Sequence, residues 1–196
     1  GLRNIIQADI HSKQLELYMD AIDVQNENIY CDRLRLNQVL LNLLNNAIKY
    51  TTAGGIVSIK VTEKAVAQEG YATYIFQVKD TGIGMSEEFV SHIFEPFERE
   101  RNSTISGIQG TGLGMAITKN IVTMMNGTIS VTSKQEVGSE FTVSFTFRVS
   151  SERKTSPLIP ELQGCRALVV DDDFNTCDSV SYMLQQIGMR AEWTLS

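Results

Sequence analysis

Residues 141–148 alternate strictly between apolar and polar side chains. In an extended chain, Phe141, Val143, Phe145 and Phe147 share one face, and the polar residues between them share the other. This pattern predicts a half-buried strand. The fold must therefore contain a sheet with one covered face.

Shorter patterns predict the elements that accompany this strand. Strands are expected at residues 15–21, 57–61 and 74–78, and helices at residues 4–14, 32–50 and 113–125. The second and third of these strands should pair as a hairpin across the Glu69–Gly70 turn. The order of elements predicts an α/β (α+β) two-layer sandwich, with a mixed, mostly antiparallel sheet and helices on one face.

A second, smaller unit follows a polar segment. We divide the chain into a domain at 1–149, a linker at 150–164 that holds two of the three prolines, and a further unit at 165–196. That unit is expected to contain a strand at 167–170, a helix that stops at Gly188 and the start of another strand.

Composition narrows the class of protein. With 42% hydrophobic residues among 196, the chain can bury a core. The net charge of −6 and the lack of a basic cluster argue against nucleic acid or a membrane as a partner. Three scattered cysteines suggest a reducing compartment. No apolar run reaches the roughly 20 residues of a membrane span. We expect a cytoplasmic location, for a parent that can be anchored in the inner membrane.

The helix at 32–50 carries a polar stripe beside its apolar one. Asn42, Asn46 and Lys49 follow one another at i, i+4 and i+7, so they share a side of the helix. Asparagine is a mediocre helix former, and an amide oxygen aimed at a hard cation would account for the pattern. A solvated face would account for it equally well. The helix alone does not decide between the two.

Two glycine-rich loops add candidate ligand contacts. Residues 80–85, DTGIGM, present Asp80 at a strand end where glycines allow a ligand close to the backbone. Residues 110–114, GTGLG, lead into a helix whose N-terminus can bind phosphate. Each loop alone could be a simple turn. Neither fits a dinucleotide fingerprint, and there is no Walker lysine.

The ordered combination of motifs is more specific than any one of them. NQVLLNLLNNAIKYT, DTGIGM, FEPFER, GTGLGMAITKNIV and GSEF occur in that order. Over about residues 3–148, the chain resembles the ATP-binding catalytic domain of sensor histidine kinases, which has the Bergerat fold shared with gyrase-like and chaperone ATPases. The resemblance implies ATP and Mg²⁺ as cofactors.

The resemblance also implies roles for individual residues. The implied catalytic residues are Asn46, which would coordinate Mg²⁺, Lys49, which would face phosphate, and Arg99, which would lie near the γ-phosphate. The other nucleotide contacts implied are Asn42 beside the metal, Tyr50, Asp80 and Ser139 at adenine, Gly82 and Gly84 below it, Phe97 before the lid, and Gly110, Thr111, Gly112, Leu113 and Gly114 around the phosphates. Residues 99–109 would form a lid over the nucleotide.

Some residues near these motifs have plainer interpretations. Phe94 and Phe97 would hinge the lid to the core, or simply be core aromatics. His11 and His92 lie in no phospho-acceptor motif, so both are expected to be ordinary histidines. Glu136 replaces the first glycine of the family's usual GxGSxF, so the adenine-side loop is expected to differ without loss of ATP binding.

The unit at 165–196 resembles the start of a response-regulator receiver domain. ALVVDDDFN places acids at a strand end, and Asp171 and Asp172 match that family's metal-binding acids. The phospho-accepting aspartate of the family follows a third strand, which this sequence does not reach. A truncated, doubly wound receiver start is therefore expected.

These features predict a protein-histidine kinase that transfers the γ-phosphoryl group of ATP to a histidine on a separate dimerisation domain, in a two-component phosphorelay. A receiver domain or response regulator is the further partner, and the fragment should be monomeric. A gyrase-like or chaperone-like ATPase would want a carboxylate where Asn42 stands. A non-catalytic nucleotide-binding module is the third alternative.

Overall fold

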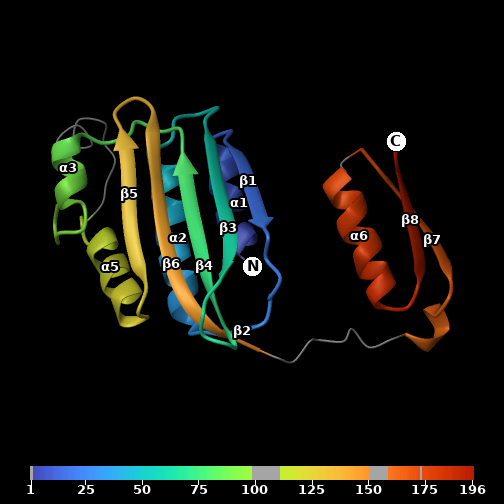
Figure 1. Ribbon diagram of the computed structural model, residues 1–196. Coiled ribbons are helices and arrows are strands. Elements are labelled where there is room, and N and C mark those ends of the chain that lie inside the picture. Colours follow the sequence, from blue (N-terminus) through green and yellow to red (C-terminus); the bar gives the residue numbers. More distant parts are fainter. Residues whose placement is uncertain (1, 99–110, 151–158, 173) are drawn as a thin grey trace. The chain divides into compact units, whose positions relative to one another are not determined.

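A computed structural model describes residues 2–98, 111–150, 159–172 and 174–196 (Figure 1). Arg99, Gly110 and the segment between them lie outside the described residues. The chain separates into two compact units, Gly1–Ser151 and Glu152–Ser196, and each is treated by itself.

The first unit is built on one mixed sheet of six strands. The strands are β1 (Glu16–Ile22), β2 (Ile29–Tyr30), β3 (Ile56–Ala65), β4 (Tyr71–Asp80), β5 (Thr128–Lys134) and β6 (Gly138–Val149). Their order is β1-β3-β4-β6-β2, with β5 also paired to β6. β1 and β3 run parallel, and the other pairs are antiparallel. The predicted mixed sheet and the hairpin of β3 and β4 are confirmed.

Helices cover one face of this sheet, which confirms the two-layer sandwich. They are α1 (Leu2–Ser12), α2 (Arg33–Tyr50), α3 (Glu87–His92) and α5 (Gly114–Met124). Figure 1 shows α1 and α2 behind the strands, and α5 packs against α2 and β5. The start of α2 is set by Asp32, whose carboxylate accepts from the Arg35 amide at 3.0 Å.

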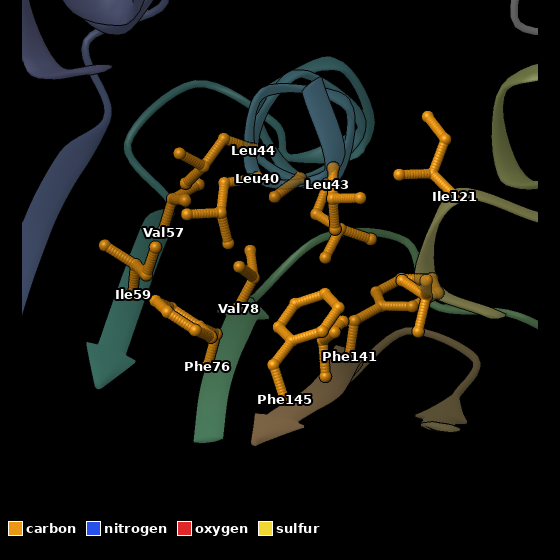
Figure 2. Packing of buried hydrophobic residues seen from close by; sticks show 14 of the residues in the cluster. Leu40, Leu43, Leu44, Val57, Ile59, Phe76, Val78, Ile121, Phe141 and Phe145 are labelled. Atoms are coloured by element: carbon orange, nitrogen blue, oxygen red, sulfur yellow. The ribbon is translucent and has the colours of Figure 1, made fainter. Parts of the chain in front are cut away.

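The core lies between these layers (Figure 2). Leu43 and Leu44 of α2 are fully buried against Val57 and Val78 of the sheet, and Phe145 is 1% exposed. Burying each such side chain contributes about 1.5–3 kcal/mol before the entropic cost of ordering it. The apolar stripe of α2 and the alternation of β6 were the patterns that predicted this contact.

Three elements of the first unit were not predicted. β5 alternates, but its inward residues Ile129 and Val131 are only half-buried, so the pattern is weak. β2 is two residues long. α3 has six residues, starts at the Ser86 cap and has acidic residues in its first turn.

The second unit contains β7 (Arg166–Asp171), α6 (Phe174–Gln186) and β8 (Arg190–Leu195). The two strands are parallel and joined through the helix, which is a βαβ unit. Cys177 belongs to α6, and its thiol is buried. The rings of Phe174 on α6 and Trp193 on β8 meet edge to face, with their centres 5.1 Å apart. A short 3-10 helix, Pro160–Leu162, precedes β7, and the Gly164 amide donates to the Gly188 carbonyl at 2.8 Å.

Candidate functional site

A cavity of about 260 Å³ opens between α2, α3, the loop after β4, the start of α5 and the start of β6. It gathers most of the residues singled out from the sequence. Those lining it are Asn42, Asn46, Lys49, Tyr50, Asp80, Gly84, Thr111, Gly112, Gly114 and Ser139. Leu113 is the N-cap of α5 beside it, and Gly82 is buried in the loop after β4.

The polar stripe of α2 faces this cavity and not open solvent. The Asn42 side-chain amide donates to the Gly114 carbonyl at 2.8 Å and to the Thr118 hydroxyl at 2.6 Å, so it ties α2 to the start of α5. The Asn46 amide donates to the Met115 sulfur at 3.2 Å. Both asparagines are half-buried. The solvated-face interpretation of the stripe is therefore wrong.

Lys49 and Tyr50 form the last turn of α2. The Lys49 ammonium lies 5.2 Å from the centre of the Tyr50 ring, within the range of a cation–π contact. The Tyr50 carbonyl accepts from the Ile83 amide at 3.2 Å, which joins the end of α2 to the glycine-rich loop after β4. A side chain at Gly82 would collide with that carbonyl, so only glycine fits there.

Asp80 ends β4 inside the cavity and is 5% exposed. One oxygen, Oδ1, accepts from the Gly82 amide at 2.8 Å and from the Ser139 amide at 3.3 Å. Burial raises the pKa of this carboxyl above its usual value, and the two amide donors only partly offset that rise. The site therefore presents a buried acceptor whose backbone partners hold one oxygen.

Gly84 lines the cavity and has φ of +63°. A Cβ there would collide with the Lys134 carbonyl, because the loop lies directly against the turn between β5 and β6. The Glu136 amide donates to the Ile83 carbonyl at 2.7 Å. Glu136 itself has φ of +61°. The loop thus keeps the left-handed conformation that suits a glycine, although glutamate occupies this position.

The N-terminus of α5 also opens on the cavity. Leu113 at its N-cap position makes no side-chain cap bond. The Leu113 amide meets the Thr111 hydroxyl at 3.4 Å, and Gly112 has φ of +71°. Backbone N–H groups at such a helix start, together with the helix dipole, attract anions. Gly110 lies outside the described residues.

The two phenylalanines before the predicted lid differ. Phe94 is half-buried against the core, with the Lys119 ammonium 5.4 Å from its ring centre. Phe97 is 73% exposed, so its interpretation as a core aromatic is wrong. Its amide donates to the Gly112 carbonyl at 3.0 Å, and Phe97 is not among the described residues that line the cavity. Arg99 and the lid predicted at 99–109 lie outside the described residues.

The two histidines lie outside this cavity. His92 faces Glu95 at 3.1 Å, and this carboxylate raises the pKa of the exposed imidazole. His11 lies in the last turn of α1.

An apolar wall of the cavity was not found from the sequence. It consists of Ile83, Met85, Phe89, Ile93, Met115 and Phe141. Phe89 and Ile93 belong to α3 and the residue after it. The N-cap Ser86, followed by two glutamates, is a helix-start signal that could have located them. Such a wall suits the flat face of an aromatic ligand.

Carboxylate clusters are missing from the part of the chain that the structure describes. There, no group of three or more His, Cys, Asp and Glu residues could hold a metal ion. Asp171 and Asp172 lie at the end of β7, where the sequence places them, and their metal role remains a prediction.

A family model described as histidine kinase-, DNA gyrase B- and HSP90-like ATPase matches residues 31–149. The chain belongs to this family. Within it, the first unit is a catalytic domain of the histidine kinase type, homologous to those of sensor kinases.

Individual relatives are named as sensor kinases or sensor proteins. The autoinducer 2 sensor kinase/phosphatase LuxQ of Vibrio vulnificus is 36% identical over 172 residues, which are 84% of this chain and 20% of LuxQ. The sensor protein GacS of Pseudomonas syringae pv. syringae is 35% identical over 97% of this chain and 22% of GacS. The chain therefore spans about a fifth of the length of these relatives.

Solved structures agree with the fold. Full-length ShkA in complex with AMPPNP matches 98% of this chain and 38% of its own, at 25% identity and a TM-score of 0.60. The catalytic domain of the histidine kinase ThkA, in a nucleotide-free form, matches 74% of this chain and 86% of its own, at 25% identity and a TM-score of 0.59. Among the described residues, no helix has the length and hydropathy to cross a membrane.

Proposed function

We propose that the first unit binds Mg-ATP and donates the γ-phosphoryl group to a histidine on a separate dimerisation domain, in two-component phosphorelay signalling. One observation carries the proposal. A buried acceptor, Asp80, and the N-terminus of α5, whose N-cap residue Leu113 makes no side-chain cap bond, open on the same cavity. An adenine amine suits the first, and phosphates suit the second.

The polar residues of α2 fit a metal held together with the nucleotide. Mg²⁺ prefers oxygen ligands and usually keeps several waters beside substrate phosphates, so one amide oxygen from the protein is enough. Asn46 can supply it, and the bound cation would neutralise charge on the phosphates. Lys49 and Arg99 would add fixed positive charge at the transferred group. Gly110, Thr111, Gly112 and Gly114 would wrap the phosphates, and Tyr50 and Ser139 would border the base.

The reaction needs little acid–base help from this domain. A neutral histidine nitrogen is already a nucleophile. The bond from the γ-phosphorus to the bridging oxygen breaks as the phosphorus–nitrogen bond forms, and ADP leaves. Positioning and charge stabilisation would supply most of the catalysis.

The structure of α2 favours a kinase over a hydrolase. A gyrase-like or chaperone-like ATPase would need a base one turn before Asn46. Asn42 stands there, and a neutral carboxamide is too weak a base to take a proton from water. Its amide nitrogen instead donates to the Gly114 carbonyl and the Thr118 hydroxyl. We expect slow hydrolysis in the absence of an acceptor.

We further infer that the second unit begins a receiver domain, with boundaries as the sequence suggests: a domain at 1–149, a linker at 150–164 and the receiver start at 165–196. Its parallel βαβ arrangement and the acids at the end of β7 support this. The partners would be the histidine-bearing domain of the same parent and a receiver or response regulator, and the setting would be the cytoplasm.

The decisive experiment combines the protein with Mg²⁺, ATP labelled at the γ-phosphate and the dimerisation domain of a related sensor kinase. We expect acid-labile, base-stable label on that domain. Asn46→Ala should abolish the transfer while the far-ultraviolet circular dichroism spectrum stays unchanged. Rapid hydrolysis without acceptor would favour the ATPase, and tight ATP binding without either reaction would favour the regulatory module.

A further inference from the structure

Lys13 lies at the corner between α1 and β1 and is half-buried. Its ammonium is 2.8 Å from the Ile48 carbonyl, 2.8 Å from the Lys49 carbonyl and 3.3 Å from the Thr51 carbonyl. An ammonium group has three N–H donors, and here each has a carbonyl within reach. All three carbonyls belong to the C-terminal turn of α2 or to the residue that caps it.

The end of α2 needs such a donor. A helix leaves its last four carbonyls without intrahelical partners, and many helices satisfy them by a glycine in the left-handed conformation. Here the C-cap is Thr51, which is extended, with φ of −91° and ψ of 133°. The Ala47 carbonyl accepts from the Thr51 amide, and the Tyr50 carbonyl accepts from the Ile83 amide. Lys13 serves the carbonyls of Ile48 and Lys49.

Two backbone hydrogen bonds fix the corner to the loop that follows α2. The Gly54 amide donates to the Gln14 carbonyl at 3.2 Å, and the Glu16 amide donates to the Gly55 carbonyl at 3.0 Å. The position of the Lys13 ammonium is thus set by its own backbone as well as by the carbonyls. Its charge also complements the negative end of the α2 dipole.

We propose that Lys13 is a positioning residue of the nucleotide site. It fixes the turn that carries Lys49 and Tyr50, and through the Tyr50 carbonyl it fixes the loop after Asp80. Lys13 is not among the residues that line the cavity, so it acts through these groups and not by contact with a ligand. This role rests on the proposed function, because it concerns how that site binds ATP.

Lys13→Met tests the role, because it removes the ammonium and keeps an unbranched side chain. We expect ATP affinity in the presence of Mg²⁺, measured by calorimetry, to fall about tenfold, the size of one lost charge-assisted hydrogen bond. We also expect faster hydrogen exchange at the Ile83 amide, measured by nuclear magnetic resonance. This second readout reports the loop without requiring activity.

Glu63→Met is the matched control. The Glu63 carboxylate accepts three hydrogen bonds, from the amides of Gln25 and Asn26 and from the Asn26 side chain, at 2.6–2.8 Å. Glu63 pairs with Tyr74, which lies six residues before Asp80 on β4. At the rise of a strand, six residues correspond to about 20 Å between Tyr74 and Asp80. Its loss should lower the free energy of unfolding without changing ATP affinity or exchange at Ile83.

The outcomes separate this role from the proposed function. Wild-type protein with no affinity for ATP would overturn both. Wild-type binding with unchanged affinity in Lys13→Met would overturn the role of Lys13 alone. Equal losses of affinity in the two methionine variants would assign the effect to general destabilisation and would also overturn it.

Discussion

Asp80→Asn tests how the cavity would recognise the adenine base of ATP. The substitution preserves shape, and the structure fixes the orientation of the new amide. Oδ1 of Asp80 accepts from the amides of Gly82 and Ser139, so the introduced carbonyl oxygen must take that place. Its NH₂ group then faces the cavity, where the proposed function requires an acceptor.

The magnitude follows from the bond that is lost. A hydrogen bond to a charged group contributes about 1.5–3 kcal/mol, which corresponds to about 10- to 150-fold in affinity. Two donors, the introduced NH₂ and the adenine amine, would also oppose each other. ATP affinity should therefore fall at least about tenfold. ITP, whose base carries an acceptor in place of the amine, should bind the variant better than it binds the wild type.

The free protein should not be destabilised. Because burial raises the pKa of Asp80 in the folded state, the charged carboxylate weakens the fold as pH rises through that raised pKa. An amide lacks this penalty. The free energy of unfolding at neutral pH should be equal to or higher than that of the wild type, by urea titration without nucleotide. ATP affinity within threefold of the wild type, or no gain for ITP, would refute the assigned role.

Two further predictions concern the loops and the sheet. Gly84→Ala should lower the free energy of unfolding by about 2–3 kcal/mol, because the added Cβ would meet the Lys134 carbonyl. Gly54 has a similar φ but open space around it, so Gly54→Ala should cost only about 1–2 kcal/mol. Equal costs for the two variants, measured by urea titration, would contradict the steric argument. Burial, with a smaller effect of the Glu63 charge, raises the pKa of Tyr74 to about 12 from 10. Stability should therefore fall as pH rises from 10 to 12, and Tyr74→Phe should remove that fall; an unchanged pH dependence of thermal unfolding would show that Tyr74 is not its source.

Local patterns were enough to predict the main layers. The alternation of β6 and the apolar stripe of α2 each specify a buried face, and the two faces meet in the core around Phe145 and Leu43. The order in which the strands pair was harder to predict from the sequence. β1 pairs in parallel with β3, and β5 joins β6 with only two apolar residues, Ile129 and Val131, on its inward face. Neither choice leaves a strong trace in a short stretch of sequence.

In the site, too, local motifs could be predicted from the sequence and long-range contacts could not. Motifs predicted the polar residues and glycines that line the cavity, because such residues are unusual enough to mark a ligand, but they did not predict its apolar wall. Contacts between distant elements could not be predicted. The bonds from Asn42 to the start of α5 span 72 and 76 residues of sequence, and those from Lys13 to the end of α2 span 35 to 38. A lone lysine after a helix gives no signal that it caps another helix.

The parallel pairing of β1 with β3 affects where the chain can be cut. The family match begins at residue 31 and so omits α1, β1 and Lys13. A piece trimmed to that limit would leave the ten residues of β3 as a bare sheet edge, a template for aggregation, and would remove Ile6 and Leu15 from the core. The core of this unit therefore includes residues of α1 and of the corner before β1, well ahead of its first recognisable motif.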